Sequence, residues 1–232
     1  MNRLGSTAMK CTGIAFLFSL MLAAATWADE GQTSLFNGKD LDGWQAEGVK
    51  EYKDQDGKDQ PVWSVRDGLL HCQGKGFGFL RSTKREYGDF EFHVEYRMHN
   101  AKCNSGIGIR TGAFDPKKSR ETRPSFYSYE IQLFDDHGKP PDVHSTGSLY
   151  RYVAPRINPS KPLGEWNVVD IVCQGPKLRV TINDEKVIDV DQSSIAELKN
   201  KPLKGYVCLQ NHGGILDFRN IRIREIKASA GP

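Results

Sequence analysis

The sequence predicts an all-β protein, a sandwich of two antiparallel sheets of the jelly-roll type. Apolar and polar residues alternate with a period of two along almost every apolar run after Val62, which is typical of half-buried strands. Turn residues such as Arg66-Asp67-Gly68 and Asn183-Asp184 separate these runs. Only Ser193 to Leu198 has the spacing of a helix, over one or two turns. About a dozen short strands joined by tight turns favour two packed sheets.

The N-terminus has the pattern of a cleaved signal peptide. Arg3 and Lys10 precede an apolar run over residues 13–25, and small residues follow before an acidic pair. The run is about half as long as the roughly 20 residues that a helix needs to cross a bilayer. We therefore predict a signal peptide over residues 1–28, cleaved after Ala28, and a periplasmic or secreted protein without membrane attachment. A retained anchor is the alternative.

The mature chain is nearly neutral, and we expect one sandwich domain over residues 29–226 with a disordered tail over 227–232. Removal of Arg3 and Lys10 with the signal peptide leaves 30 Lys and Arg against 29 Asp and Glu. This balance does not indicate a nucleic-acid partner. The densest basic group lies in a loop that contains proline, where a solvated surface explains it; it consists of Lys117, Lys118, Arg120 and Arg123.

Four cysteines remain after export, namely Cys72, Cys103, Cys173 and Cys208. An oxidising compartment would allow three different pairings among them. Their wide spacing resembles neither a zinc site nor a small disulfide-rich scaffold. We expect either free buried thiols or one disulfide.

Three of the predicted strands share one pattern of polarity. In the run from Phe90 to Met98, the aromatic and aliphatic residues alternate with Glu91, His93, Glu95 and Arg97. Tyr127 to Phe134 and Tyr206 to His212 alternate in the same way. Because successive side chains of a strand point to opposite faces, each strand has an apolar face and a polar face.

Three polar stretches interrupt the strand pattern, at Glu51 to Pro61, Asp115 to Pro124 and Asp135 to Thr146. Long loops on a compact domain are places where binding and catalytic sites are often built. We therefore expect a site near one of these stretches.

A polar face that carries the ionisable residues of these strands is either ordinary solvated surface or a groove that binds a ligand. Glu130 has aromatic neighbours in sequence at Phe126, Tyr127 and Tyr129. Aromatic rings stack on sugar rings, while amides and arginines pair with sugar hydroxyls. Aromatic residues near Glu130, together with the polar side chains of this face, favour a carbohydrate ligand. The residues of the expected face are Glu95, Arg97, Arg110, Glu130, Gln132, Gln210 and His212.

The run from Tyr129 to Asp135 invites comparison with the catalytic strand of retaining β-glucanases, Glu-x-Asp-x-x-Glu. A retaining glycosidase needs two carboxyl groups about 5 Å apart. Here the central position is Gln132 and the last is the shorter Asp135. A two-carboxylate mechanism is therefore disfavoured, although Glu130 and Asp135 remain candidates for other roles.

His212 follows a predicted strand, where an imidazole can serve as a general acid or base, although a lone histidine at a turn is more often structural. A metal site built from His93, Glu95 and His212 is conceivable, but no ligand spacing demands one. A divalent metal is therefore left open.

The run from Asn104 to Arg110 contains glycines that allow close approach of a ligand or of backbone, with a bulge or core packing as the alternative. The chain has no phosphate-binding loop, no dinucleotide fingerprint and no serine nucleophile elbow. These absences argue against a redox cofactor, phosphoryl transfer and serine hydrolysis.

Several motifs in order along the mature chain resemble those of the 3-keto-disaccharide hydrolase family, over residues 34–225. They are Ser34-Leu-Phe-Asn-Gly-Lys-Asp-Leu-Asp-Gly-Trp44, Trp63-Ser-Val-Arg-Asp-Gly-Leu69, Asp89-Phe-Glu-Phe, Asn104-Ser-Gly-Ile, Tyr129-Glu-Ile-Gln, Thr146-Gly-Ser-Leu-Tyr150, Leu209-Gln-Asn-His-Gly and Phe218-Arg-Asn-Ile-Arg222. The resemblance implies a sandwich similar to the concanavalin A-like lectins and glucanases. It also implies cleavage of 3-keto-glycosides that a partner oxidoreductase supplies.

That activity would account for the missing carboxylate pair. A ketone at C3 acidifies the C2 hydrogen, so one base, one proton donor and one enolate stabiliser suffice to eliminate the C1 substituent. We expect Glu130 and His212 to share the base and donor roles, with Arg110, Arg97 or a cation at the enolate. The expected substrate-binding residues are Glu95, Arg97, Asn104, Gln132, Asp135, Tyr150 and Gln210. A lectin-like module that binds glycan without cleaving it is the alternative.

Overall fold

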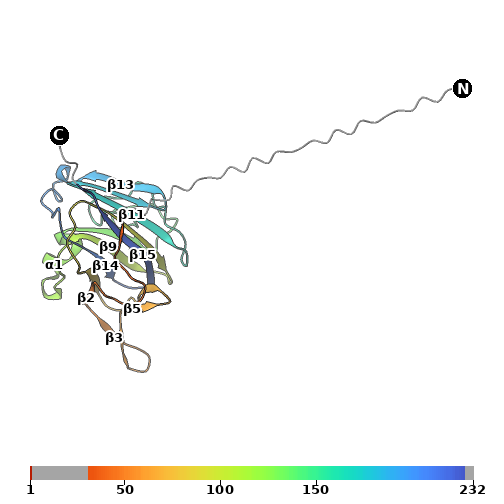
Figure 1. Cartoon of the computed structure of the whole chain (residues 1–232), viewed down its shortest axis with the longest axis vertical. Helices are drawn as coiled ribbons and strands as arrows, with labels where there is room; N and C mark the ends of the chain where they lie inside the picture. The colour runs from red at the N-terminus through yellow and green to blue at the C-terminus, as the bar shows by residue number, and fades with distance from the viewer. Residues whose placement is uncertain (2–30, 228–232) are drawn as a thin grey trace. The chain divides into compact units, whose positions relative to one another are not determined.

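Two antiparallel sheets pack against each other in the computed structural model, which describes Met1 and residues 31–227 (Figure 1). The sandwich prediction is therefore confirmed. Apart from Met1, the expected signal peptide lies outside the described residues, as does all of the expected tail except its first residue. Within the described part of the chain, no helix is both long and apolar enough to span a membrane.

The larger sheet has eight strands among the described residues, in the order β13-β12-β11-β8-β15-β6-β5, with β1 also paired to β15. All of the strand pairs in this sheet are antiparallel. The strands are β1 (Thr33–Ser34), β5 (Trp63–Arg66), β6 (Leu69–Cys72), β8 (Phe90–Met98), β11 (Asn167–Gln174), β12 (Lys177–Ile182), β13 (Glu185–Asp191) and β15 (Leu216–Glu225).

The smaller sheet has five strands in residues 31–227 and follows the order β10-β9-β14-β7-β2. Its pairs are also antiparallel, with an irregularity in the register between β14 and β9. The strands are β2 (Trp44–Gly48), β7 (Gly78–Ser82), β9 (Asn104–Thr111), β10 (Tyr129–Phe134) and β14 (Tyr206–Asn211). This sheet carries the candidate site described below.

The polar stretches contain more regular structure than the sequence predicts. The first one forms a separate hairpin of β3 (Glu51–Lys53) and β4 (Asp59–Pro61), which projects from one end of the sandwich in Figure 1. The second contains short helical turns, η1 (Pro116–Lys118), α1 (Ser119–Thr122) and α2 (Pro124–Tyr127). The expected helical turns over Ser193 to Leu198 are reduced to a 3-10 helix, η2 (Gln192–Ser194).

The alternation predicted from the sequence sets which side chains fill the core. In β8 the aromatic and aliphatic side chains are buried, and the four polar ones between them are only partly buried. In β10 and β14, Ile131 and Leu209 belong to the same apolar cluster. Burial of this apolar surface is the main stabilising contribution to such a fold. The opposite faces of the strands are left for polar groups.

The polar faces of β8, β10 and β14 do not form one surface, and this expectation was wrong. β8 is central in the larger sheet, whereas β10 and β14 belong to the smaller one. Because each sheet turns its apolar face inward, their polar faces lie on opposite sides of the sandwich. The same alternation of polar and apolar residues therefore occurs in strands of both sheets, and it does not predict which sheet a strand joins.

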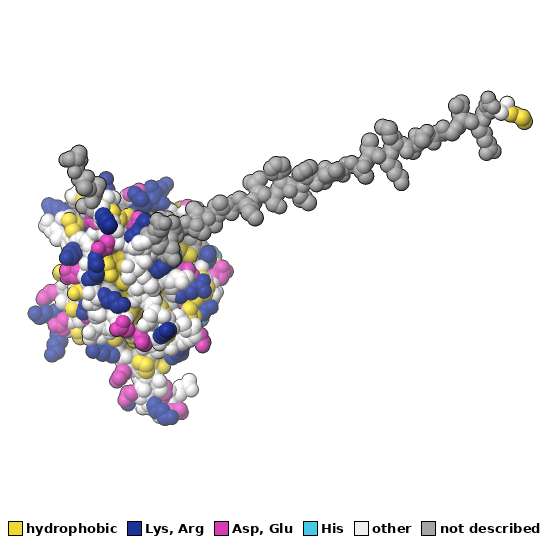
Figure 2. Space-filling model, viewed as in Figure 1, with side chains coloured by type: hydrophobic (Ala, Val, Ile, Leu, Met, Phe, Trp, Pro, Cys, Tyr) yellow, Lys and Arg dark blue, Asp and Glu magenta, His cyan; other side chains and the backbone are white. Residues whose placement is uncertain are grey.

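The four cysteines within residues 31–227 are free and buried. This agrees with the first of the two expectations for them. Burial raises the pKa of the Cys72, Cys103 and Cys173 thiols to about 12, so they are unreactive at neutral pH. On the visible surface, charged side chains of both signs are interspersed (Figure 2).

Candidate active site

A small polar pocket lies on the face of the smaller sheet that points away from the core. Its volume is about 20 Å³, which is enough for one water or one hydroxyl group. β9, β10 and β14 form its floor, and the segments around α2 and after β10 form its walls. The lining residues are Asn104, Arg123, Ser125, Glu130, Gln132, Tyr150, Gln210 and His212.

Glycines in β9 make room for the carboxylate at the floor of the pocket. A Cβ atom at Gly106 would lie 2.9 Å from Oε1 of Glu130. A Cβ atom at Gly108 would lie 2.4 Å from the Cys208 sulfur and 3.0 Å from Cγ of Pro124. The contacts at 2.9 and 2.4 Å are shorter than real Cβ atoms make, so a larger residue at either position would displace its neighbours. The two glycines therefore let Glu130 lie flat on the sheet and let α2 close over it.

Glu130 is almost completely enclosed, with 4% of its surface exposed. Nε2 of Gln210 donates a hydrogen bond to its Oε1 at 2.7 Å. Burial raises the pKa of Glu130 to about 7, although polar contacts with Gln210 and Ser125 and the charge of Arg123 oppose the rise. A carboxyl group with this pKa can give or take a proton at neutral pH.

Three buried oxygen atoms in the pocket lack a hydrogen-bond donor among the described residues. They are Oε2 of Glu130, Oε1 of Gln132 and Oε1 of Gln210. The Nε2 groups of both glutamines are already used, since that of Gln132 donates to Oδ1 of Asn104 at 3.1 Å. An unsatisfied buried acceptor costs about 1–3 kcal/mol. Donors from a ligand, such as sugar hydroxyls, would remove this cost.

The imidazole of His212 stands at the mouth of the pocket, edge-on to the ring of Phe77 at 4.9 Å between centroids. The guanidinium carbon of Arg123 lies 4.2 Å from the same ring. Burial, and then the charge of Arg123, lower the pKa of His212 from its ordinary value of 6.5. The imidazole is therefore neutral at neutral pH, which leaves one ring nitrogen free to accept a proton.

The segment after β10 folds back along its edge and closes one wall of the pocket. The backbone N–H of Tyr150 donates to the carbonyl of Glu130 at 2.9 Å, and that of Gln132 donates to Ser148 at 3.1 Å. The Tyr152 hydroxyl donates to the carbonyl of Ser125 at 3.1 Å. These bonds fix Tyr150 and α2 against the strand that carries Glu130.

The pocket brings together six of the residues that the sequence analysis proposed: Asn104, Glu130, Gln132, Tyr150, Gln210 and His212. Arg123 and Ser125 were missed. The signal that could have found them is their position on either side of Pro124, a few residues before the strand of Glu130. Arg123 had been interpreted as part of a solvated basic loop.

Arg110 does not line the pocket, contrary to our expectation. β9 has one residue more than β14 between their paired positions, since Gly108 pairs with Cys208 and Thr111 with Tyr206. Arg110 lies in this bulge with φ of 51°, and a bulge re-aims side chains. Its buried guanidinium donates instead to the carbonyls of Gly88 and Gly175, at 2.9 and 2.8 Å. These bonds indicate a structural role.

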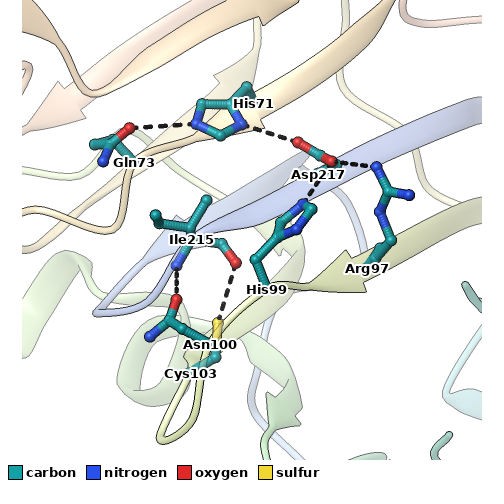
Figure 3. A network of polar contacts seen from close by, with 8 residues as sticks. All are labelled: His71, Gln73, Arg97, His99, Asn100, Cys103, Ile215 and Asp217. Carbon is teal, nitrogen blue, oxygen red and sulfur yellow. Dashed lines mark hydrogen bonds and ion pairs between the residues drawn. The ribbon is translucent and has the colours of Figure 1, made fainter. Parts of the chain in front are cut away.

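Glu95 and Arg97 also lie away from the pocket, because β8 is in the other sheet. Glu95 accepts hydrogen bonds from Arg219 and Asn220. Arg97 donates to Asp217 at 2.8 Å, in a network that His71 and His99 join (Figure 3). Arg97 therefore does not reach a substrate held at Glu130.

Asp135 is likewise outside the pocket lining, and its Oδ2 accepts the backbone N–H of Lys102 at 2.9 Å. The metal ligands considered from the sequence are separated as well. His93 is paired with Asp170 in the larger sheet, whereas His212 follows β14 in the smaller one. Within residues 31–227, no three His, Cys, Asp or Glu side chains gather as a metal site.

Comparisons with known proteins agree with this fold. A 3-keto-disaccharide hydrolase from Bacteroides thetaiotaomicron (strain VPI-5482) is 23% identical over 235 residues, covering 84% of this chain and 78% of the relative. A crystal structure from Parabacteroides distasonis ATCC 8503, of a protein provisionally named a glycosyl hydrolase, is 27% identical with a TM-score of 0.65, covering 84% of this chain and 99% of that one.

The lumenal domain of VIP36, solved in a Ca²⁺/Man3GlcNAc-bound form, shares the fold alone. It is 10% identical with a TM-score of 0.55, over 88% of this chain and 92% of that one. This likeness agrees with a sandwich of the concanavalin A-like type. The sequence model of the 3-keto-alpha-glucoside-1,2-lyase-like domain matches residues 31–224. Because this match spans most of the chain, the protein belongs to the 3-keto-alpha-glucoside-1,2-lyase-like domain family.

Proposed function

We propose that this protein cleaves glycosides whose sugar ring carries a ketone at C3, by removing the C2 proton and eliminating the substituent at C1. The observation that carries the proposal is a buried Glu130, with a pKa of about 7, in the same pocket as a neutral His212. Retaining and inverting hydrolysis both require two carboxyl groups. The pocket lining holds only one, that of Glu130. Family membership and the name of the curated relative support the same substrate class.

The proposed reaction needs one proton removed and one proton supplied. A base takes the C2 hydrogen, and its electron pair forms an enolate with the C3 carbonyl. Collapse of the enolate forms the C1–C2 double bond and expels the C1 oxygen, which takes a proton from the donor. Addition of water to the resulting enone at C1, with return of a proton to C2, gives the free 3-keto-sugar.

The pKa directions assign the two roles. His212 has a pKa below 6.5 and is neutral at pH 7, so it is ready to accept the C2 proton. Glu130 keeps its proton up to about pH 7, so it can donate to the leaving oxygen. The opposite assignment would need an ionised Glu130 together with a protonated His212, which is a minor form at every pH.

Arg123 replaces Arg110 and Arg97 as the proposed stabiliser of the enolate. It is the cationic side chain of the pocket lining, and a fixed positive charge near the developing oxyanion lowers the barrier. The unpaired oxygens of Gln132 and Gln210 would accept hydrogen bonds from sugar hydroxyls. If a divalent cation takes part, the side-chain oxygens of Gln132 and Gln210 are the ligands that suit it.

The test compares an aryl 3-keto-glucoside with its unoxidised parent, using the mature protein with and without EDTA. We expect aryl release from the keto substrate only, and a fall in the rate on adding EDTA would indicate a metal. Glu130→Gln and His212→Asn are expected to lose activity, while the exposed Glu86→Gln serves as the matched control. Binding without release from either compound would favour the lectin-like alternative.

Two parts of the proposal concern the surroundings of the reaction. We propose that the chain is exported through its N-terminal signal and that an oxidoreductase supplies the C3 ketone. Cell fractionation of the native host tests the first part, with the protein expected outside the cytoplasm. A cleavage assay on the unoxidised glycoside tests the second, since release should begin only when a sugar 3-oxidoreductase is added.

A further inference from the structure

Three arginine side chains surround one aromatic ring beside the pocket, and a lysine bonds to the backbone of the same residue. The guanidinium carbons of Arg120, Arg123 and Arg151 lie 5.7, 5.9 and 4.3 Å from the centroid of Phe126. Nζ of Lys201 donates to the Phe126 carbonyl at 2.6 Å. We call this group, Arg120, Arg123, Arg151 and Lys201, the basic rim.

The basic rim is continuous with the pocket. Arg123 belongs to both, and Arg151 directly follows Tyr150, another residue of the pocket wall. The pocket itself holds only about one hydroxyl group. Most of a glycoside bound there must therefore lie over the mouth, within reach of the rim.

The charges of the rim lack acidic partners. In residues 31–227, none of its four members forms an ion pair with a carboxylate, whereas arginines elsewhere pair closely, as Arg81 does with Glu47. Glu121 is exposed on α1 and makes no ion pair with the rim either. Like charges held together without a counter-charge repel one another, and a bound anion would relieve the repulsion.

At Lys201, burial has a larger effect than this crowding of charges. Its pKa is lowered to about 8, first by burial and then by the charge of Arg151. The backbone of Arg151 is held in place, since its N–H donates to the carbonyl of Val143 at 2.8 Å. The guanidinium of Arg123 donates to the Ser119 hydroxyl at 3.0 Å. These anchors limit the entropy that the rim loses when an anion arrives.

We propose that the basic rim, through Arg120, Arg151 and Lys201, binds an anionic group, a carboxylate, sulfate or phosphate, carried by the leaving-group part of the glycoside, while Arg123 faces the enolate. This inference rests on the proposed function, because it takes the sugar ring to lie at Glu130 and His212. Guanidinium groups pair with such oxyanions through two parallel hydrogen bonds. The rim thus favours acidic leaving groups over neutral ones of the same shape.

The experiment compares an aryl 3-keto-glucoside that bears a carboxylate on the aryl ring with its neutral methyl ester. Two readouts are taken: kcat/KM for release, and affinity by calorimetry with the Glu130→Gln variant. We expect the acid to be preferred about tenfold in both. The double variant Arg120→Gln/Arg151→Gln should remove most of the preference. Arg179→Gln, an exposed arginine on β12, should keep it.

The outcomes separate this inference from the proposed function. Cleavage of both compounds at equal rates, with equal affinities, overturns the rim assignment and leaves the function standing. Absence of cleavage with preferential binding of the acid removes the proposed activity and supports the rim. Inorganic phosphate should compete with the acid and not with the ester; phosphate binding without preference for the acid overturns the assignment to the substrate.

Discussion

Burial of Glu130 should make the protein less stable at high pH, and the variant Glu130→Gln measures the cost. Each pKa unit corresponds to about 1.4 kcal/mol, so a rise from 4.5 to about 7 costs the ionised folded state about 3 kcal/mol. The cost is absent below about pH 4.5, where both states bind the proton. It grows with pH and is complete above about pH 7, because only the folded state resists losing the proton.

Glutamine keeps the acceptor for Gln210 and removes the charge, so the variant should be more stable than the parent protein. Urea unfolding should show a gain of about 1 kcal/mol at pH 5 and about 3 kcal/mol at pH 8.5. Glu86→Gln, on the surface, should show no such dependence. A gain that is the same at both pH values would refute the assignment of a raised pKa to Glu130.

Four further predictions concern activity and folding. The pH profile of kcat/KM should be bell-shaped, rising through the lowered pKa of His212 and falling above about pH 7; a profile that stays high above pH 8 would contradict protonated Glu130 as the proton donor. His212→Asn should lower kcat by about 10²–10⁴ with the melting temperature unchanged, and an active variant contradicts the base role. Gly106→Ala should reduce kcat because its Cβ would meet Glu130 at 2.9 Å, and wild-type kinetics would show that Glu130 needs no such room. Arg110→Met should cost about 2–5 kcal/mol of stability, measured by thermal melting, because the carbonyls of Gly88 and Gly175 lose their donor. The folded fraction of this variant should keep a normal kcat, whereas Arg123→Gln should lower kcat.

The local pattern of the strands could be predicted from the sequence because it depends on the alternation of side chains alone. β8 shows the predicted alternation of buried and partly buried residues, whereas in β10 and β14 the polar residues between the apolar ones are buried as well. The pairing of strands is different, because it depends on contacts between residues far apart in the chain. β8 was therefore placed with β10 and β14 although it pairs with β11 and β15.

The candidate site was predictable to the extent that it lies on regular strands. Glu130 and Gln132 share one face because of their even spacing, and Gln210 joins them from β14, which pairs with the other edge of β9. Arg110 has the same parity as Gly106 and Gly108, but the bulge in β9 redirects it. Arg123 reaches the pocket through the fold of a loop, which alternation does not describe. The alternation of residues in the sequence does not predict where side chains point in bulges and loops.

The central claim is that the bond at C1 breaks by removal of the C2 proton, and isotopic substitution at C2 tests it most directly. The substrate is an aryl 3-keto-glucoside that carries deuterium at C2, compared with its unlabelled form. Our account predicts slower aryl release from the labelled substrate and loss of deuterium from the sugar product to solvent. Equal release rates with deuterium retained in the product would contradict elimination and require direct displacement at C1.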